Sequence, residues 1–542
     1  MRVKHLVAAA SLAAGTASIG PLASLVPVTP QTGPRLEITI APDARAESTT
    51  GMVYVAFSRD NKRTPIQQAG PTGAPLFSVA ISDLQSGTPI AITAADRGHP
   101  IVSLRDIPAG EYWVQPFVNV YTRFARADGK VVWLHMDQWE GQDWKRSPGN
   151  LFGDPVKLTF DPRATGPIRL NVDKVIPPIQ PPADTAQVKR IKIQSARLSK
   201  WWGHPIYLGA TVLLPKDYDS HPDVRYPINY EQGHFSLRAP GGFGTGGAFD
   251  TFWLAATTPR MIYVTLQHPS PYYDDSYGVN SENNGPYGDA IMHELIPAIE
   301  STFRVIREPW ARMLSGGSTG GWIAAAHQVF YPDFYGGAFA SCPDSVDFRY
   351  HQIVDIYKDA NAYFIDRGWT KTPRPNQRRP DGNIESMMQD ENHYELVIGD
   401  RSRSGGQWDI WEATYSPAGA DGYPQRLWNK LTGDIDRTVA EMWRKYDLRH
   451  VLESNWPTLG PKVGHKLNVY VGDMDSYYLN DAVEKLNEFL IKADHPRFTG
   501  EIVFERKAPH CWGPRNADLM AKMVRQIEKT APAGADLKGW RY

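Results

Sequence analysis

The chain is 542 residues long and 42% hydrophobic, which is enough for two or three domains with sizeable cores. Its 58 basic and 59 acidic residues leave a formal net charge of -1, so it has no electrostatic footprint for nucleic acid or an anionic membrane surface. Two cysteines without a matching set of histidines exclude a structural zinc site, and we expect no metal or organic cofactor.

The N-terminus has the pattern of a secretory signal peptide. Arg2, Lys4 and His5 are basic, and an alanine-rich apolar run from Leu6 to Ala17 follows them. A buried N-terminal helix is the alternative, but the segment has no polar face. We therefore assign residues 1–33 to a signal peptide and leader, and expect a secreted or periplasmic protein. No later segment is apolar for long enough to span a membrane.

Residues 34–175 are predicted to form a β-sandwich. Short β-rich runs alternate with turn residues, and no long segment with helical periodicity interrupts them. A proline-rich linker, residues 176–184, follows, because paired prolines favour an extended conformation. The expected strands are Met52–Phe57, Phe77–Ile81, Tyr112–Phe117, Val131–Leu134 and Ile168–Val172.

From residue 185 to residue 542 the pattern changes to strands that alternate with helices. In the helix expected over Tyr287–Phe303, apolar residues recur every four positions. Such alternation predicts an α/β domain with a mostly parallel sheet covered by helices on both faces. The expected strands are Ile206–Leu214, Pro227–Tyr230, Met261–Gln267, Arg312–Ser315, Gly337–Ser341, Leu467–Val471 and Ile502–Phe504.

One stretch of this domain is too long for a plain connection. Residues 345–460, rich in Trp, Tyr and Arg, are predicted to form a cap inserted over the carboxyl edge of the sheet. Trp408, Trp411 and Trp428 are candidates to shape a substrate pocket there.

The sequence Gly316-Gly317-Ser318-Thr319-Gly320 fits the pattern G-x-S-x-G between a predicted strand and a predicted helix. A serine on that sharp turn projects above the sheet, and the flanking glycines avoid clashes with neighbouring elements. A phosphate-binding loop is the alternative, but the G-K-[ST] ending that it needs is missing. Ser318 is therefore the predicted nucleophile.

A serine needs a base, and the base needs an orienting acid. With this motif the chain order is serine, acid, histidine. His510 follows the last predicted strand, whereas His495 lies between a helix and a strand, so His510 is the predicted base. The strand Leu467–Val471 leads to two carboxylates; Asp475 is favoured as the acid over Asp473.

The oxyanion hole needs two backbone N–H groups. We assign them to Thr319, directly after the nucleophile, and to His234, in the loop after the strand Pro227–Tyr230. Cys342 and Cys511 are both expected near the carboxyl edge of the sheet. They are a candidate disulfide, with two independent buried thiols as the alternative.

These residues together resemble an esterase family of α/β-hydrolases. The family includes S-formylglutathione hydrolases, feruloyl and acetylxylan esterases, bacterial mycolyltransferases and enterochelin esterase-like proteins. The resemblance covers the chain from about Asp184 onward and is most specific in Asn284–Gly288, Glu294–Pro297 and Gly316–Gly321. It implies an α/β-hydrolase catalytic domain, here with an inserted cap and behind an N-terminal β-sandwich. Gln232-Gly233 stands where the family has His-Gly.

The predicted function is that of a secreted serine hydrolase acting on a small-molecule or carbohydrate-linked carboxylic ester. Two alternatives remain open. One is an acyltransferase in which a sugar or another alcohol replaces water, and the other is a non-catalytic binding protein built on a hydrolase scaffold. The sequence gives no indication of the acyl group, the alcohol or the oligomeric state.

Overall fold

The computed structural model describes residues 33–136 and 139–542. The segment assigned to the signal peptide and leader lies, except for Gly33, outside the described residues. Within the described ranges, no helix is both long and apolar enough to cross a bilayer.

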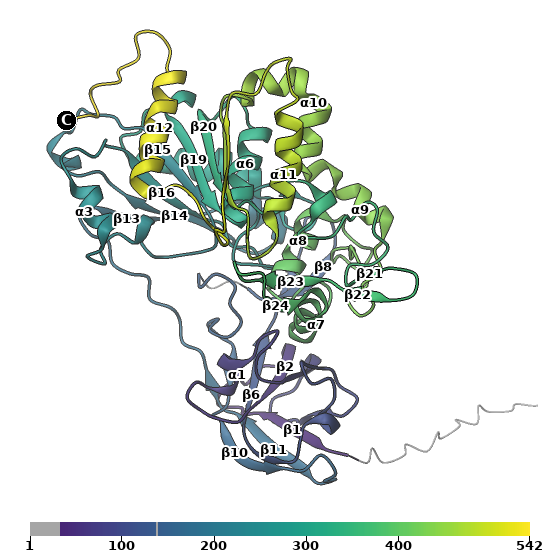
Figure 1. Cartoon of the computed structure of the whole chain (residues 1–542). Helices are drawn as coiled ribbons and strands as arrows, with labels where there is room; N and C mark the ends of the chain where they lie inside the picture. The colour runs from purple at the N-terminus through teal and green to yellow at the C-terminus, as the bar shows by residue number, and fades with distance from the viewer. Residues whose placement is uncertain (1–32, 137–138) are drawn as a thin grey trace, which may run out of the picture.

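The N-terminal part holds two β-sheets, which lie at the end of the molecule opposite the main sheet (Figure 1). A three-stranded sheet has the order β11-β1-β4, and a seven-stranded sheet has the order β12-β9-β6-β2-β3-β5 with β10 beside β6. Their bounds are β1 Arg35–Ile40, β2 Thr49–Ser58, β3 Leu76–Leu84, β4 Ile90–Thr93, β5 Gly98–His99, β6 Gly110–Val120, β9 Leu151–Phe152, β10 Val156–Phe160, β11 Pro167–Val172 and β12 Lys174–Val175; the short helix α1 is Pro65–Gln68.

A single apolar cluster connects these two sheets. Leu36 and Ile38 of β1 and Leu170 of β11 are fully or almost fully buried in one cluster with Val53 and Val55 of β2. Alternate residues of these strands therefore face the other sheet, and β2 is buried on its second face as well.

One predicted strand of this region belongs elsewhere. The segment expected at Val131–Leu134 forms a separate hairpin, β7 (Thr122–Ala125) with β8 (Val131–Leu134). Its buried side chains Phe124, Val132 and Leu134 pack into the core of the α/β part rather than into the cluster between the two N-terminal sheets. Alternating apolar residues predict a buried face correctly but do not identify what covers that face.

The α/β part is built on an eight-stranded sheet of order β13-β14-β16-β15-β19-β20-β25-β26. β13 and β14 are antiparallel to their neighbours, and the pairs from β16 to β26 are parallel. Seven of these strands coincide with predicted ones. The edge strand β13, VKRIKIQ, is not among the predicted strands; it is short in apolar residues, and only Val188 is buried. The bounds are β13 Val188–Gln194, β14 Tyr207–Leu213, β15 Ile228–Gln232, β16 Ile262–Gln267, β19 Arg312–Gly317, β20 Gly337–Ser341, β25 Leu467–Gly472 and β26 Glu501–Glu505.

Helices follow most of these strands, as the periodicity predicts. The helix expected over 287–303 is present from Tyr287 to Thr302, with a π-helical turn at Ile291–Leu295 inside it. The two ends of this helix are α4 Tyr287–Ala290 and α5 Ile296–Thr302. The other helices of this part are α2 Ala196–Trp202, α3 Ala248–Leu254, α6 Thr319–Phe330, α11 Leu479–Leu490 and α12 Asn516–Thr530, and the small strands β17 Asn280–Ser281 and β18 Gly285–Pro286 form one hairpin.

A long insertion separates β20 from β25. In Figure 1 its helix α7 lies between the main sheet and the N-terminal sheets. Val397 and Ile398 of α7 are buried in one cluster with Tyr54 and Phe117 of the seven-stranded sheet. The insertion contains β21 Phe364–Asp366, β22 Lys371–Pro373, β23 Pro375–Arg378, β24 Ile384–Met387, α7 Met388–Ile398, α8 Gln407–Tyr415, α9 Arg437–Trp443 and α10 Leu448–Val463.

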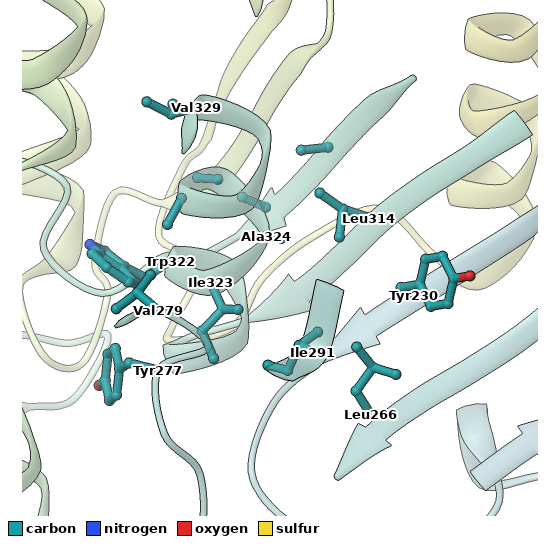
Figure 2. Close-up of a cluster of buried hydrophobic side chains, with 14 of the residues drawn as sticks. Tyr230, Leu266, Tyr277, Val279, Ile291, Leu314, Trp322, Ile323, Ala324 and Val329 are labelled. Carbon is teal, nitrogen blue, oxygen red and sulfur yellow. The ribbon is translucent and has the colours of Figure 1, made fainter. Parts of the chain in front are cut away.

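Helix α6 is the central element of the core. Every residue from Thr319 to Val329 is buried, and Figure 2 shows Ile323 and Ala324 packed toward Leu314 of β19 and Ile291. Close packing continues at the start of the helix, because a Cβ on Gly320 would lie 2.0 Å from the carbonyl oxygen of Gln232. The loop after β15 therefore touches the first turn of α6.

We expect the Gly320→Ala variant to lose about 1–3 kcal/mol of stability, because its methyl group meets backbone atoms that can move little. Gly166→Ala is the matched control, since its Cβ would enter open space. Thermal unfolding of the two variants measures the difference. Equal midpoints for both would show that the loop after β15 can move away from α6.

Candidate active site

Ser318 occupies the turn between β19 and α6. Its φ of 56° lies in the left-handed region that a residue with a side chain seldom adopts. The Ser318 N–H donates to the carbonyl of Ser341 on β20, at 3.1 Å, which fixes the strained turn to the neighbouring strand. This conformation is the nucleophile elbow expected for the G-x-S-x-G pattern.

The structure brings Ser318, His510 and Asp475 together, although 192 positions of the chain separate Ser318 from His510. His510 Nε2 lies 3.0 Å from Ser318 Oγ, and His510 Nδ1 lies 2.8 Å from Asp475 Oδ2. Asp475 is fully buried, and its second oxygen accepts hydrogen bonds from the backbone N–H groups of Tyr477 and Leu479. The carboxylate is therefore held in one orientation by the loop after β25.

Asp473 and His495, the alternatives for the acid and the base, do not contact Ser318 or His510 among the contacts of the described residues. Asp473 Oδ1 accepts a hydrogen bond from the backbone N–H of Lys507 and so holds a turn. His495 is 90% exposed in its side chain and pairs only with the adjacent Asp494 among the contacts of the described chain. Sequence spacing favoured Asp475 over Asp473, and only the loop geometry separates them.

The pKa of His510 depends on its polar neighbours. Burial lowers the pKa of the imidazole, but hydrogen bonds to Asp475 and Cys511 outweigh burial and raise that pKa to about 10. A base must be neutral to accept the proton of the serine, so the active fraction of the protein grows with pH over the neutral and alkaline range.

The two cysteines lie beside this pair. Cys342 and Cys511 are free cysteines whose Sγ atoms are 2.6 Å apart, so the predicted disulfide is absent from the structure although the predicted proximity is present. A hydrogen bond from Cys342 is the main cause that lowers the pKa of the Cys511 thiol. Sequence placed both residues at the carboxyl edge of the sheet but could not determine their covalent state.

The two residues predicted for the oxyanion hole lie on either side of the contact between α6 and the loop after β15. Thr319 is the first residue of α6, and its side-chain hydroxyl donates to Asp344. His234 lies in the loop, with its imidazole Nδ1 2.9 Å from Asp274 Oδ1 and 3.3 Å from Asp275 Oδ2. Burial lowers the pKa of His234, but these two carboxylates outweigh burial and raise the pKa well above its usual value.

Three polar side chains next to the nucleophile were not predicted. Asp344, three residues after the end of β20, accepts hydrogen bonds from the hydroxyl groups of Ser318 and Tyr277 and from the side-chain amide of Gln407. Its position in the sequence could have indicated Asp344, because it follows a parallel strand at the carboxyl edge of the sheet, where ligand sites form. Tyr277 and Gln407 come from a long loop and from the insertion, where sequence patterns do not fix side-chain placement.

A cavity of about 840 Å³ opens onto Ser318 and His510. Its walls come from all three parts of the chain: the N-terminal segment 141–146, the loops of the main sheet, and the insertion. Trp408 and Trp411 line it, as expected. Trp428 does not line it; this ring is buried behind Trp408, with the ring centroids 5.1 Å apart.

Two groups of side chains in the described residues have ligand atoms close enough to hold a metal ion. One is Cys342, His510 and Cys511, and the other is His234, Asp274 and Asp275. The first includes the residue bonded to the serine, and the second is already an ion-paired cluster. The side chains of both groups already have hydrogen-bond or ion-pair partners within the protein, so we assign neither group as a metal centre.

No family model and no curated protein matches the chain. Among solved structures it is similar to a ferulic acid esterase, with 17% identity, coverage of 63% of this chain and 98% of that chain, and a TM-score of 0.36. It is also similar to an S-formylglutathione hydrolase from Agrobacterium tumefaciens, with 12% identity, coverage of 64% and 95%, and a TM-score of 0.35.

These neighbours are the kinds of esterase named by the sequence resemblance, which is thereby confirmed as a resemblance. At TM-scores below 0.5 they add nothing about activity. The assignment of an α/β-hydrolase fold rests on the parallel sheet order and on the nucleophile elbow between β19 and α6.

We expect Asp475→Asn to lower kcat by about 10³- to 10⁴-fold, because the amide leaves the imidazole wrongly oriented and its charge unbalanced. Asp473→Asn is the matched control on the same loop and should retain activity within about tenfold. Steady-state hydrolysis of a small activated ester measures both. A larger loss in Asp473→Asn would reverse the choice between the two acids.

The pH profile gives a second expectation. Because the pKa of His510 is raised to about 10, kcat/KM should rise from about pH 7 up to about pH 10. In Asp475→Asn the hydrogen bond that raises this pKa is weakened, so the rising limb should move to lower pH. An unshifted limb in that variant would mean that Asp475 does not act on His510.

Proposed function

We propose that this protein is a serine hydrolase that cleaves carboxylic esters of small molecules. The observation that supports the proposal most directly is the chain of contacts from Ser318 Oγ to His510 Nε2, at 3.0 Å, and from His510 Nδ1 to Asp475 Oδ2, at 2.8 Å. A hydroxyl bonded to an imidazole that is oriented by a buried carboxylate is the arrangement needed to make serine nucleophilic.

In the first half of the reaction Ser318 Oγ forms a bond to the ester carbonyl carbon, and its proton passes to His510 Nε2. Asp475 stabilises the imidazolium that results. The backbone N–H groups of Thr319 and His234 are the proposed donors to the negative carbonyl oxygen. His510 then gives the proton to the alcohol oxygen as its bond to the acyl carbon breaks.

In the second half a water molecule attacks the acyl-enzyme. His510 takes a proton from this water, the new C–O bond forms, and the bond to Ser318 Oγ breaks as the serine recovers its proton. The carboxylic acid leaves. These steps use only the side chains and amides of the chain itself.

We propose the domain organisation that the sequence predicts. The apolar cluster shared by the two N-terminal sheets supports a β-sandwich over residues 34–175, apart from the hairpin β7–β8. Residues 176–184 are the proposed linker, and residues 185–542 are the proposed hydrolase domain. The insertion supplies several walls of the cavity, which supports a cap over about residues 345–460.

Export is a further part of the proposal. Arg2, Lys4 and His5 followed by the apolar run Leu6–Ala17 support a signal peptide, and hence a secreted or periplasmic enzyme.

We expect a fluorophosphonate probe to label the wild-type protein and to fail with Ser318→Ala, because the probe phosphonylates an activated serine, whose oxygen displaces fluoride from phosphorus. Hydrolysis of short-chain esters should be lost in the same variant. Labelling of neither protein would contradict the proposal and favour a binding protein. Product analysis with a competing alcohol identifies acyl transfer, which would appear as a new ester exceeding the acid product.

A further inference from the structure

Asp344 is an unusual neighbour for a nucleophilic serine. Its side chain is 4% exposed, and its Oδ1 lies 3.2 Å from Ser318 Oγ. None of the ion pairs among the described residues includes Asp344, so no Lys or Arg compensates it. Burying a carboxylate without a cation is costly unless hydrogen bonds or a ligand satisfy it.

One oxygen of Asp344 is fully satisfied by the protein. Tyr277 OH accepts hydrogen bonds from Trp411 Nε1 and Gln407 Nε2, so its own hydrogen is directed to Asp344 Oδ2. The Thr319 hydroxyl and the Gln407 amide also donate to this Oδ2, at 3.1 and 3.2 Å. Donors of this kind hold the carboxylate in place and favour its ionised form.

The other oxygen, Oδ1, has one donor among the printed contacts of the described residues, the hydroxyl of Ser318. That hydroxyl has a single hydrogen, and catalysis requires it on the bond to His510 Nε2. In the reactive state Oδ1 is therefore left facing the cavity with its charge unmatched. Burial raises the pKa of Asp344 above its usual value, and the Tyr277 hydrogen bond and the charges of His510 and His234 offset this effect only in part.

The cavity around Asp344 has an acidic lining. Five carboxylates line it against two basic side chains of Lys and Arg type. Lys145 Nζ donates to the carbonyl of Ala69. Asp143 pairs with Arg146, Asp274 with His234 and Glu395 with Lys430. Of the five carboxylates, which are Asp143, Asp274, Asp344, Glu391 and Glu395, Asp344 and Glu391 therefore have no basic partner among the ion pairs of the described residues. These two carboxylates favour a cation over an anionic ligand in the cavity.

We propose that Asp344 binds a positively charged amino group on the acyl part of the substrate, so that the preferred substrates are esters of α-amino acids with a free amino group. The proposal rests on the ester hydrolysis proposed above. It goes further by naming the substrate class and a specificity residue.

Geometry favours the acyl part over the alcohol. His510 must face the leaving alcohol oxygen, and its partners are Asp475 and Cys511. Asp344 has a separate set of partners on the other side of the serine, Tyr277, Thr319 and Gln407. In an α-amino acid ester the nitrogen is about 2.5 Å from the carbonyl carbon, two bonds away, so a carboxylate that touches Ser318 Oγ can contact it.

The test compares the ethyl esters of L-alanine and L-lactate, which differ in carrying an ammonium or a hydroxyl at one position. At about pH 6.5, where the amine is protonated, wild-type kcat/KM should favour the alanine ester by at least about tenfold. Asp344→Asn keeps the shape but removes the charge. It should lower the ratio of kcat/KM for the alanine ester to kcat/KM for the lactate ester about 100-fold, whatever its effect on the lactate ester itself.

Asp143→Asn is the matched control, since it removes another carboxylate of the same cavity that already pairs with Arg146. It should retain the preference for the alanine ester. A further arm needs no variant: at about pH 9 the amine is neutral, so the wild-type preference should shrink toward unity. This arm keeps the proposal testable even if Asp344→Asn fails to fold.

Three results would overturn the inference. The first is an equal wild-type kcat/KM for the two esters. The second is an equal loss for both esters in Asp344→Asn, which would give Asp344 a purely structural role. The third is a preference for propionylcholine that depends on Asp344, which would mean that Asp344 binds a cation on the alcohol part of the substrate. Fluorophosphonate labelling separates these from failure of the proposed function. A labelled protein without amino selectivity contradicts only this inference, and an unlabelled protein contradicts the esterase proposal itself.

Discussion

The active centre depends on the contact between the first turn of α6 and the loop that follows β15. Gly320 approaches the carbonyl of Gln232 so closely that no side chain fits between them. This contact brings the start of α6, where Thr319 lies, against Gly233 at the start of the loop that holds His234. The strained φ of Ser318 is tolerable because the surrounding sheet and helix are tightly packed.

The charges near Ser318 are arranged in two groups with opposite effects. Asp475 lies behind His510 and stabilises positive charge on the imidazole, which favours proton transfer from the serine. Asp344 lies beside the serine and disfavours negative charge at the carbonyl oxygen unless a cation or a proton compensates it. His234 lies in the same cavity, and its interaction with Asp344 lowers the pKa of that carboxyl. A positively charged substrate would complete the compensation.

Sequence was sufficient where chemistry restricts the choice of residue. The glycines around Ser318 have one steric explanation, and chain order leaves few histidines after the acid, so Ser318 and His510 are predicted as nucleophile and base from the chain alone, and the structure brings their side chains into contact. Choosing between Asp473 and Asp475 depended on a loop conformation, and the state of Cys342 and Cys511 on a distance; neither can be calculated from spacing. The contacts of Asp344 could not be predicted from the sequence, because they are with Ser318, Tyr277 and Gln407, which are distant in the chain.

Residues 141–146 line the cavity, so the N-terminal part of the chain forms one of its walls. These residues precede the proline-rich segment, yet they face the same space as Ser318. Substitutions in the first third of the chain can therefore alter which esters fit without disturbing the α/β scaffold. Exchange of that region between related proteins would be a direct route to new selectivity, with the chemistry of the serine left intact.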